Sequence, residues 1–542
     1  MPFIAWIITL IFTTENVLPY LIGLSHTPKD AVFLGTVHHP SDYFYYVSQI
    51  AQGTTRWITA IDLYTSESIK PTLIGWSNVL IGNLLIPLGA SPMLAYQIAI
   101  VILTITLFLA AYLLAKEVFG DNKRLATISL YLFGLYHAFP IVRDGLPSYG
   151  DYFNNFAVPR VRYGAVPHQL LLATVSIFLT FLILQWSKTK KNHSIKQLLL
   201  ITVSSIILSS LQPALWATII GTFSLSAIIF RLSHRDTKDI LNTFIIPIFI
   251  AIIAGILPTL YLSNLFQTLP FIQLKSWEVT QHTTFTFHHF ISATGPIFLI
   301  AIATMPWFLK KYTYSKIYIS LFAIISLSVF LSPIPTILGL SHVRFMSTLV
   351  VLCLSIIATA GIEKFSESCL MYLRSVFSIT RLEHPQHIHL IILTILTIYL
   401  LPNHLLTIRL ASEFSPTNAY HYIARSEYEF LQKSARVSSS DDTFLVIWPY
   451  NVMFPAISGR RSFHGHSLLT INSTQKDALA TQFFDNKMSE EQARIFLQEH
   501  HISHVLAYSW TTLPKGFMIH KATSGSLSLF EVNQEYLKTY SK

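Results

Sequence analysis

One carboxylate, Asp42, lies where a chemical step at a membrane surface would need it. It follows the first apolar stretch of membrane-spanning length and is surrounded by Tyr43, Tyr45 and Tyr46. A carboxylate in such a position can take a proton from a hydroxyl group or hold a divalent cation. Tyrosine side chains suit a membrane interface and a sugar-stacking surface alike. We therefore interpret Asp42 as a candidate general base, and the alternative is an ordinary solvated loop aspartate.

A second polar segment combines arginines with acidic side chains. Its candidate substrate-binding residues are Arg143, Asp144, Asp151, Arg160, Arg162 and His168. The planar guanidinium group of arginine matches phosphate oxygens with two parallel hydrogen bonds. The segment therefore indicates capture of a lipid-linked phosphate or pyrophosphate, with a carboxylate nearby. Contact with lipid headgroups or local ion pairing is the alternative, and a lone histidine such as His168 is more often a structural residue.

A third candidate is Arg344, at the end of a late apolar stretch in Ser341–Phe345. An arginine at that depth is costly unless its side chain reaches the interface or meets a partner. We interpret Arg344 as a ligand of a donor phosphate. The alternative is that its side chain only extends to the membrane surface.

The composition predicts a polytopic α-helical membrane protein. Of the 542 residues, 52% are hydrophobic and 12% are charged, whereas soluble proteins carry about 25% charged residues. Runs of about 20 apolar residues recur, and helices satisfy their own backbone groups inside a bilayer. About eleven spans are predicted, at residues 3–24, 92–116, 125–140, 165–186, 197–211, 215–231, 240–262, 290–309, 317–334, 344–362 and 388–408. The first is expected to be a retained helix because it has no basic leader and no clear cleavage site.

The distribution of Lys and Arg predicts how the chain crosses the membrane. Basic residues concentrate in alternate short loops, near residues 116–124, 188–196, 231–238, 310–316 and 364–381. Such loops face the cytoplasm, and this bias also explains the net charge of +10 without a nucleic-acid partner. We therefore expect a plasma or inner membrane protein with a cytoplasmic amino terminus and long outer loops at 25–91 and 141–164.

The composition changes near residue 412. We predict a transmembrane domain over 1–411 and a small extracytoplasmic α/β domain over 412–542. Within the second domain, helices are expected near 427–436 and 489–500, and strands near 443–448, 504–508 and 526–532. Residues 459–466 are expected to form a polar turn, and contact with an acceptor is the alternative for them.

These features together resemble the GT-C superfamily of integral-membrane glycosyltransferases, including its bacterial mannosyltransferase and arabinosyltransferase branches. In the first loop the resemblance rests on Asp42-Tyr43, Gln49–Gly53 and Tyr64–Glu67. It also rests on the charged residues of the second loop, on Arg344-Phe345 and on the α/β tail. As architecture it covers the whole chain, while its specific motifs cover about a tenth of it.

The resemblance implies an inverting transfer of a sugar from a polyprenyl-phosphate donor to a glycan, lipid or protein acceptor. The step would take place on the outer face of the membrane, in cell-envelope glycan biosynthesis. Asp42 would be the catalytic base or help to bind a metal, Asp144 or Asp151 would provide the second acidic site, and Arg344 would contact the lipid phosphate. The implied cofactor is a divalent cation, Mg²⁺ or Mn²⁺, held by Asp42, Asp144 or Asp151. The sequence departs from several branches in having one carboxylate at position 42 where they have a pair.

Two other functions remain open at this point. A lipid or polysaccharide transporter would show several ionisable residues within its spans, together with inverted repeats. Glu15 is the main ionisable residue within a predicted span, and no repeat is evident. A non-catalytic scaffold or glycan-binding protein would keep the outer domain for recognition. The chain has no P-loop and no G-x-G-x-x-G motif after a strand, so cytosolic nucleotide chemistry has no support.

Overall fold

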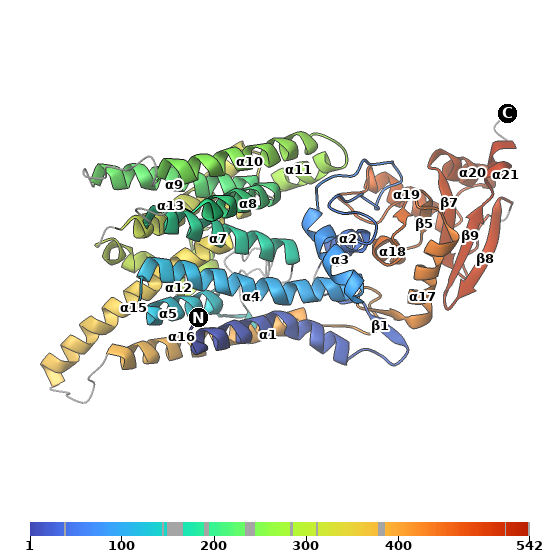
Figure 1. The fold of residues 1–542 in the computed structure, drawn as a ribbon. Coiled ribbons are helices and arrows are strands. Elements are labelled where there is room, and N and C mark those ends of the chain that lie inside the picture. Colours follow the sequence, from blue (N-terminus) through green and yellow to red (C-terminus); the bar gives the residue numbers. More distant parts are fainter. Residues whose placement is uncertain are drawn as a thin grey trace. The chain divides into compact units, whose positions relative to one another are not determined.

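The chain forms two compact units, which are described one at a time below (Figure 1). The computed structural model describes residues 1–36, 39–143, 146–148, 166–188, 194–233, 244–281, 286–310, 313–377, 385–514 and 516–539. Unit 1 consists of Met1–Asn16, Ile100–Leu265 and Glu278–Leu410. Unit 2 consists of Val17–Ala99, Phe266–Trp277 and Ala411–Lys542. The predicted domain boundary at residue 411 stays a prediction.

Long apolar helices dominate the first unit and confirm the predicted fold class. Among the described residues, nine helices are long and apolar enough to cross a membrane. They are α1 (Phe3–Ser25), α4 (Pro92–Phe119), α7 (Pro167–Lys188), α9 (Pro213–Ser233), α10 (Ile246–Leu265), α12 (Phe287–Phe308), α13 (Tyr314–Leu331), α15 (Thr348–Phe377) and α16 (Pro385–Ala411). The other two predicted spans correspond to the shorter helices α5 (Lys123–Leu135) and α8 (Ile195–Leu211). Among the residues described in this unit there are also four short elements: β2 (Ile141–Arg143), β3 (Leu146–Ser148), α14 (Ile334–Ile337) and η3 (His342–Phe345).

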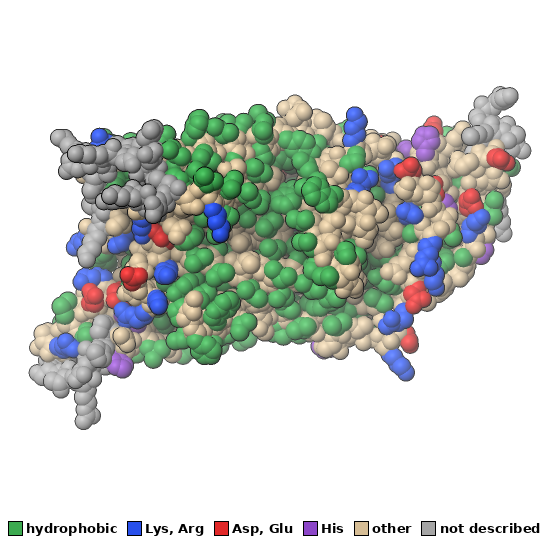
Figure 2. Space-filling model, in the orientation of Figure 1, with side chains coloured by type: hydrophobic (Ala, Val, Ile, Leu, Met, Phe, Trp, Pro, Cys, Tyr) green, Lys and Arg blue, Asp and Glu red, His purple; other side chains and the backbone are tan. Residues whose placement is uncertain are grey.

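Helix α15 is the most enclosed of the long helices and packs against α5, α12 and α13. By contrast, α10 and α16 leave large apolar side chains uncovered, with Leu257 74% and Ile398 67% exposed. Hydrophobic side chains cover much of the long helices on the face drawn in Figure 2. Apolar surface of this extent marks contact with lipid in a chain of this composition. The protein is therefore an integral membrane protein.

One polar network lies within the long helices of unit 1. Oε1 of Glu15, on α1, lies 2.9 Å from Nδ1 of His404, on α16. Next to it, the Asn403 amide donates to the Ala138 carbonyl at 2.7 Å. His137 lies 3.2 Å from the hydroxyl of Thr407. Polar groups inside a bilayer are costly unless they find such partners. Glu15, the main ionisable residue within a predicted span, has its partner in this network.

Unit 2 joins part of the first loop to the tail of the chain. From the loop come β1 (Ala31–Phe33), α2 (Pro40–Gln52), α3 (Trp76–Leu85) and η1 (Ile86–Leu88), and α11 (Phe271–Thr280) starts in this unit. From the tail come β4 (Tyr422–Ala424), α17 (Arg425–Ser434), η4 (Ala435–Val437), β5 (Thr443–Val446), α18 (Tyr450–Ser458), β6 (Arg461–Ser462), α19 (Ser473–Phe484), α20 (Glu490–Glu499), β7 (Ile502–Tyr508), β8 (Met518–Ser524), β9 (Leu527–Val532) and α21 (Gln534–Thr539). Strand β1 pairs antiparallel with β4, which connects the two segments directly.

The tail contains a mixed five-stranded sheet in the order β6-β5-β7-β9-β8. Strands β6, β5 and β7 are parallel, while β9 and β8 run antiparallel to their neighbours. Buried side chains of α19 and α20, including Phe483 and Phe496, pack with sheet residues such as Leu445 and Val505 into a hydrophobic core. The α/β architecture of the tail is confirmed. Helix α20 begins with the expected N-cap, because Ser489 forms a capping box with Gln492.

Helices α2 and α3 approach each other closely through glycine. A β-carbon at Gly82, on α3, would overlap the carbonyl group of Ile50 on α2. A β-carbon at Gly53, just after α2, would lie 2.5 Å from backbone atoms of α3. Glycine removes the side chain that would otherwise separate the two helices. This contact fixes α2, the helix that carries Asp42.

We expect Gly82→Ala to lower the stability of the protein by about 1–3 kcal/mol, because the added methyl group forces the two backbones apart. The measurement is the thermal unfolding midpoint in detergent. Gly221→Ala is the matched control, since Gly221 lies within helix α9 and a β-carbon there meets open space. That control should be neutral or stabilising by up to about 1 kcal/mol. Equal midpoints for the two variants would contradict the close approach.

Candidate active site

Asp42 lies in the first turn of α2, directly after Pro40 opens the helix. Proline suits this position because its missing N–H group would have no partner there. The positive end of the helix dipole favours a carboxylate in the first turn by about 0.3–1 kcal/mol. The opposite face of α2 is buried, through residues such as Phe44 and Ile50, and packs against α3 and α18. The side chain of Asp42 is left 49% exposed, so it can meet a substrate.

The contact that the sequence analysis missed is with His466. Its Nε2 lies 3.3 Å from Oδ1 of Asp42, and its side chain is 3% exposed. The rings of Tyr45 and Tyr64 meet the imidazole edge to face, at centroid distances of 5.7 and 5.9 Å. Within residues 459–466, which were expected to form a polar turn, the structure has strand β6 at Arg461–Ser462 and buries the side chains of His464 and His466. A sequence pattern cannot show this, because 424 residues separate the two partners.

Asp62, another carboxylate of the first loop, was also missed by the sequence analysis. It is 5% exposed, and its Oδ1 accepts the backbone N–H of Tyr64 at 2.9 Å. Burial raises the pKa of Asp62 to about 6, although the hydrogen bond from the Tyr64 backbone and the neighbouring side chains of His466, Arg461 and Lys476 oppose this shift. Asp42 and Asp62, two of the four acidic residues of the first loop, thus have different surroundings, because Asp42 is half-exposed and Asp62 is buried.

A buried lysine holds the next part of the loop. Nζ of Lys476, on α19, donates to the hydroxyls of Thr65 and Ser66 at 3.1 and 2.9 Å and to Glu67 at 2.7 Å. Those bonds use all three N–H groups of the ammonium. Burial lowers the pKa of Lys476, and its ion pair with Glu67 opposes that shift. Burial raises the pKa of Glu67, but the hydrogen bonds from Lys476 and Thr65 outweigh it, so this pKa lies below its usual value.

Further hydrogen bonds join the first loop to the tail. The Tyr64 hydroxyl donates to the Val452 carbonyl at 3.0 Å, and the Thr470 hydroxyl donates to the Tyr64 carbonyl at 2.6 Å. The backbone N–H of Ser462 donates to the Leu63 carbonyl at 2.8 Å. The surroundings of Asp42 therefore depend on the tail as much as on the first loop.

Most residues of the second predicted group lie outside the described part of the chain. Asp144, Asp151, Arg160 and Arg162 are among them, and of Arg143 only the backbone, at the end of β2, is described. His168 lies in the first turn of α7, and its Nε2 is 3.2 Å from the side-chain nitrogen of Gln169. The substrate-binding roles of this group stay predictions.

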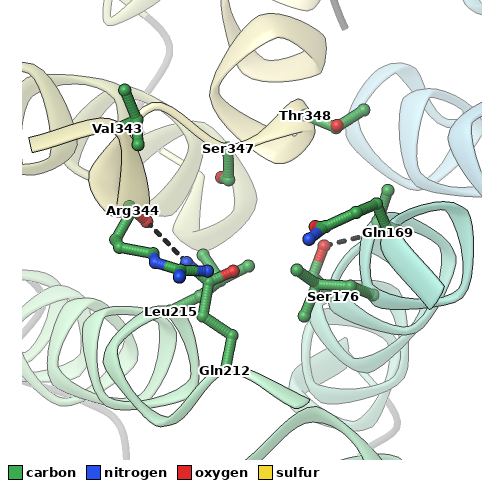
Figure 3. A pocket seen from close by; sticks show the side chains of 10 residues that line it. Gln169, Ser176, Gln212, Leu215, Val343, Arg344, Ser347 and Thr348 are labelled. Carbon is green, nitrogen blue, oxygen red and sulfur yellow. Dashed lines mark hydrogen bonds between the residues drawn. The ribbon is translucent and has the colours of Figure 1, made fainter. Parts of the chain in front are cut away.

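Arg344 lies in η3 of unit 1 and has a strong partner. Its Nε and one terminal nitrogen donate to the two carboxylate oxygens of Glu278, at 2.7 and 2.9 Å. Its carbonyl accepts a hydrogen bond from Gln212 at 3.1 Å, as Figure 3 shows. Arg344 and Gln212 line a pocket of about 270 Å³, a volume that includes space open to solvent. The buried hydroxyl of Ser347, which also lines it, has no hydrogen-bond partner among the described residues.

The protein is similar to known proteins in structure, whereas its sequence gives no match. No protein-family model and no curated protein matches the sequence. Solved structures do match, beginning with the archaeal oligosaccharyltransferase AglB from Archaeoglobus fulgidus in complex with an inhibitory peptide and a dolichol-phosphate. It aligns with a TM-score of 0.55 and 11% identity over 98% of this chain and 74% of that chain. The arabinofuranosyltransferase AftD from Mycobacteria, in a mutant form, aligns with a TM-score of 0.52 and 10% identity over 96% of this chain and 41% of that chain.

The protein has the fold of the GT-C glycosyltransferases. Identities of 10 to 11% establish the shared fold alone. ArnT from Cupriavidus metallidurans, bound to undecaprenyl phosphate, is also similar, with a TM-score of 0.48 and 11% identity over 99% of both chains. The matches with AglB and AftD confirm, at the level of the fold, the resemblance that the sequence suggested.

The GT-C fold raises the question of a metal ion. The Archaeoglobus fulgidus oligosaccharyltransferase has been crystallised with Zn and sulfate. In this protein, the described residues contain no group of three His, Cys, Asp or Glu side chains that could hold a metal ion. Two of the three predicted ligands, Asp144 and Asp151, lie outside those residues. The predicted Mg²⁺ or Mn²⁺ site therefore stays a prediction, and the step proposed below does not pass through it.

The buried carboxylate of Asp62 should make stability depend on pH. Because its folded pKa, about 6, lies above its ordinary value of 3.8, the contribution of this carboxyl group to stability is fully present below pH 4 and is lost as the pH rises through 6. The difference corresponds to a loss on the order of 3 kcal/mol. Asp62→Asn should remove this loss while keeping the oxygen that accepts from Tyr64. The thermal midpoint of the variant should exceed that of the wild type at pH 7.5 but not at pH 4.

The control for this comparison is Asp30→Asn, because Asp30 is an exposed aspartate of the same loop. It should shift the midpoint equally, or not at all, at both pH values. If Asp62→Asn behaves in the same way as Asp30→Asn, the carboxyl group of Asp62 is not buried as described.

Proposed function

We propose that the protein is an inverting glycosyltransferase that moves a sugar from a polyprenyl-phosphate donor to an acceptor hydroxyl. The observation that carries the proposal is the position of Asp42. In a chain with a GT-C fold, this half-exposed carboxylate lies at the start of a helix whose other face is buried. The carboxylate itself contacts a buried histidine, His466. A general base needs these properties, since it has to reach substrate and keep one orientation.

The proposed step balances without a nucleotide. The acceptor hydroxyl gives its proton to Asp42 while its oxygen forms a bond to the anomeric carbon of the donor sugar. The bond from that carbon to the phosphate oxygen breaks, and its electron pair leaves with the polyprenyl phosphate. Attack opposite the leaving group inverts the anomeric configuration. Polyprenyl phosphate leaves readily as a stable anion, so the protein mainly has to orient the two substrates and remove one proton.

Arg344 is proposed to bind the donor phosphate in the pocket of unit 1. Its guanidinium already holds a carboxylate with two parallel hydrogen bonds, and a phosphate presents oxygens in a similar arrangement. Ser347 adds a buried hydroxyl to the same pocket, and no residue in the described part of the chain forms a hydrogen bond with it. A phosphate that binds Arg344 has to replace Glu278, because the negative charge of Glu278 occupies the same fork and repels an anion.

The side of the membrane follows from the distribution of basic residues. Because the loops rich in Lys and Arg face the cytoplasm, we place the amino terminus inside and the tail outside. A donor carried on a lipid suits that side, where nucleotide sugars are absent. The acceptor would be a glycan, a lipid or a protein of the cell envelope. The donor would be embedded in the membrane through its lipid.

We expect Asp42→Asn to lower kcat by about 100- to 10,000-fold, because the amide has no lone pair basic enough to take the proton. The measurement is release of polyprenyl phosphate by the full chain in nanodiscs. The donors are undecaprenyl- and dolichol-phosphate mannose, glucose and arabinofuranose. Asp30→Asn, in the same loop, should leave the rate unchanged. A wild type that binds the lipid but releases no polyprenyl phosphate would instead support a scaffold or a transporter.

Arg344 and Glu278 should affect donor binding in opposite directions. Arg344→Lys should raise KM for the donor by about 10-fold, since losing a charged hydrogen bond costs about 1.5 kcal/mol or more. Glu278→Gln should lower that KM, because the competing charge is gone. Arg374→Lys, at an exposed arginine near the end of α15, is the matched control. A rise in KM for Glu278→Gln would show that Glu278 supports phosphate binding.

A further inference from the structure

The imidazole of His466 is enclosed on several sides. Its side chain is 3% exposed, and the rings of Tyr45 and Tyr64 flank it. Burial raises the pKa of both tyrosines far above the usual value, so both hydroxyl groups stay protonated. The ring of His466 therefore has little freedom to turn, and its two nitrogen atoms have fixed surroundings.

Each ring nitrogen of His466 has its own neighbour. Nδ1 accepts the backbone N–H of Leu468 at 3.2 Å. A nitrogen that accepts carries no proton, so in the neutral ring the proton is on Nε2. Nε2 lies 3.3 Å from Oδ1 of Asp42, and a carboxylate can only accept. The backbone of the tail thereby selects the tautomer that donates to Asp42.

The turn that presents His466 is itself closely fixed. Gly465 has a φ of 153°, and a side chain at that position would overlap the carbonyl of Asn451. After the histidine, the backbone N–H of His466 donates to the Thr470 hydroxyl at 3.2 Å, and the backbone N–H of Thr470 returns to the His466 carbonyl at 2.9 Å. Thr470 also donates to Tyr64 of the first loop. The tail thus holds the imidazole in place from its own side.

We propose that His466 is a positioning residue for Asp42, which holds the carboxylate in one orientation by donating Nε2–H to Oδ1. The inference rests on the proposed function, because it assigns the tail a part in the same step. His466 does not take the acceptor proton in this role, since its Nδ1 is committed to Leu468. Its contribution is to keep the carboxylate of Asp42 in the orientation needed for proton transfer when the substrate binds. A misplacement of about 1 Å can lower the rate about 100-fold.

The two bonds of His466 can be separated by a matched pair of substitutions. In His466→Asn the amide ends near the position of Nδ1, so it can still accept from Leu468 but is too short to reach Asp42. In His466→Gln the amide reaches the position of Nε2 and can still donate to Asp42. Both new side chains are polar, and neither is much larger than histidine. His464→Asn is the control, because His464 is also buried in this turn and contacts Asp477, at 2.6 Å.

The experiment measures kcat and donor KM of the full chain in nanodiscs, with the donor panel given above. The positioning role predicts a fall in kcat of about 100-fold for His466→Asn, an unchanged donor KM, and a rate within about 10-fold of the wild type for His466→Gln. A role limited to holding the turn predicts the reverse order, because only the asparagine keeps the bond from Leu468. The thermal midpoint of each variant separates loss of rate from loss of folding.

Each outcome decides the inference. The predicted order, with His464→Asn near the wild-type rate, supports it. If Asp42→Asn is inactive while His466→Asn keeps full kcat, or if His466→Gln is the slower variant, the inference is overturned and the proposed function stands. If the wild type releases no polyprenyl phosphate from any donor of the panel, the proposed function is overturned, and this role with it.

Discussion

Desolvation of charged groups is the constraint on which both units depend. An ionised group taken out of water loses several kcal/mol unless partners replace the water. In unit 2, Lys476 is 3% exposed and all its N–H groups are used on the first loop. In unit 1, Glu15 meets His404 within the long helices, and Arg344 meets Glu278. Each pairing joins segments far apart in the sequence, so the cost of burial becomes a reason for those segments to stay together.

The same constraint separates the roles of two carboxylates. Asp42 remains half in water, in the first turn of a helix. Asp62 is buried, and its pKa rises to about 6. Pairs of groups with different surroundings commonly divide the tasks of an active site. Here the exposed carboxylate suits contact with a substrate, while the buried one contributes to the loop and to the pH response.

The tail of the chain takes part in the site rather than only adjoining it. Strand pairing between β1 and β4, the Lys476 contacts and the bond from Thr470 to Tyr64 all cross from the first loop to the tail. His466 brings that connection to Asp42 itself. An acceptor that binds the tail would therefore affect the same segment that orients the proposed base.

Local patterns were enough to predict the fold class and to identify Asp42 as a candidate functional residue. Apolar runs predicted the long helices because a bilayer leaves the backbone few alternatives. Ser489 and the strand signals predicted the elements of the tail, since caps and alternation act over a few residues. Only the tertiary structure showed the neighbours of Asp42. His466, Asp62 and Lys476 become informative through burial and contact, and those properties arise when segments hundreds of residues apart pack together.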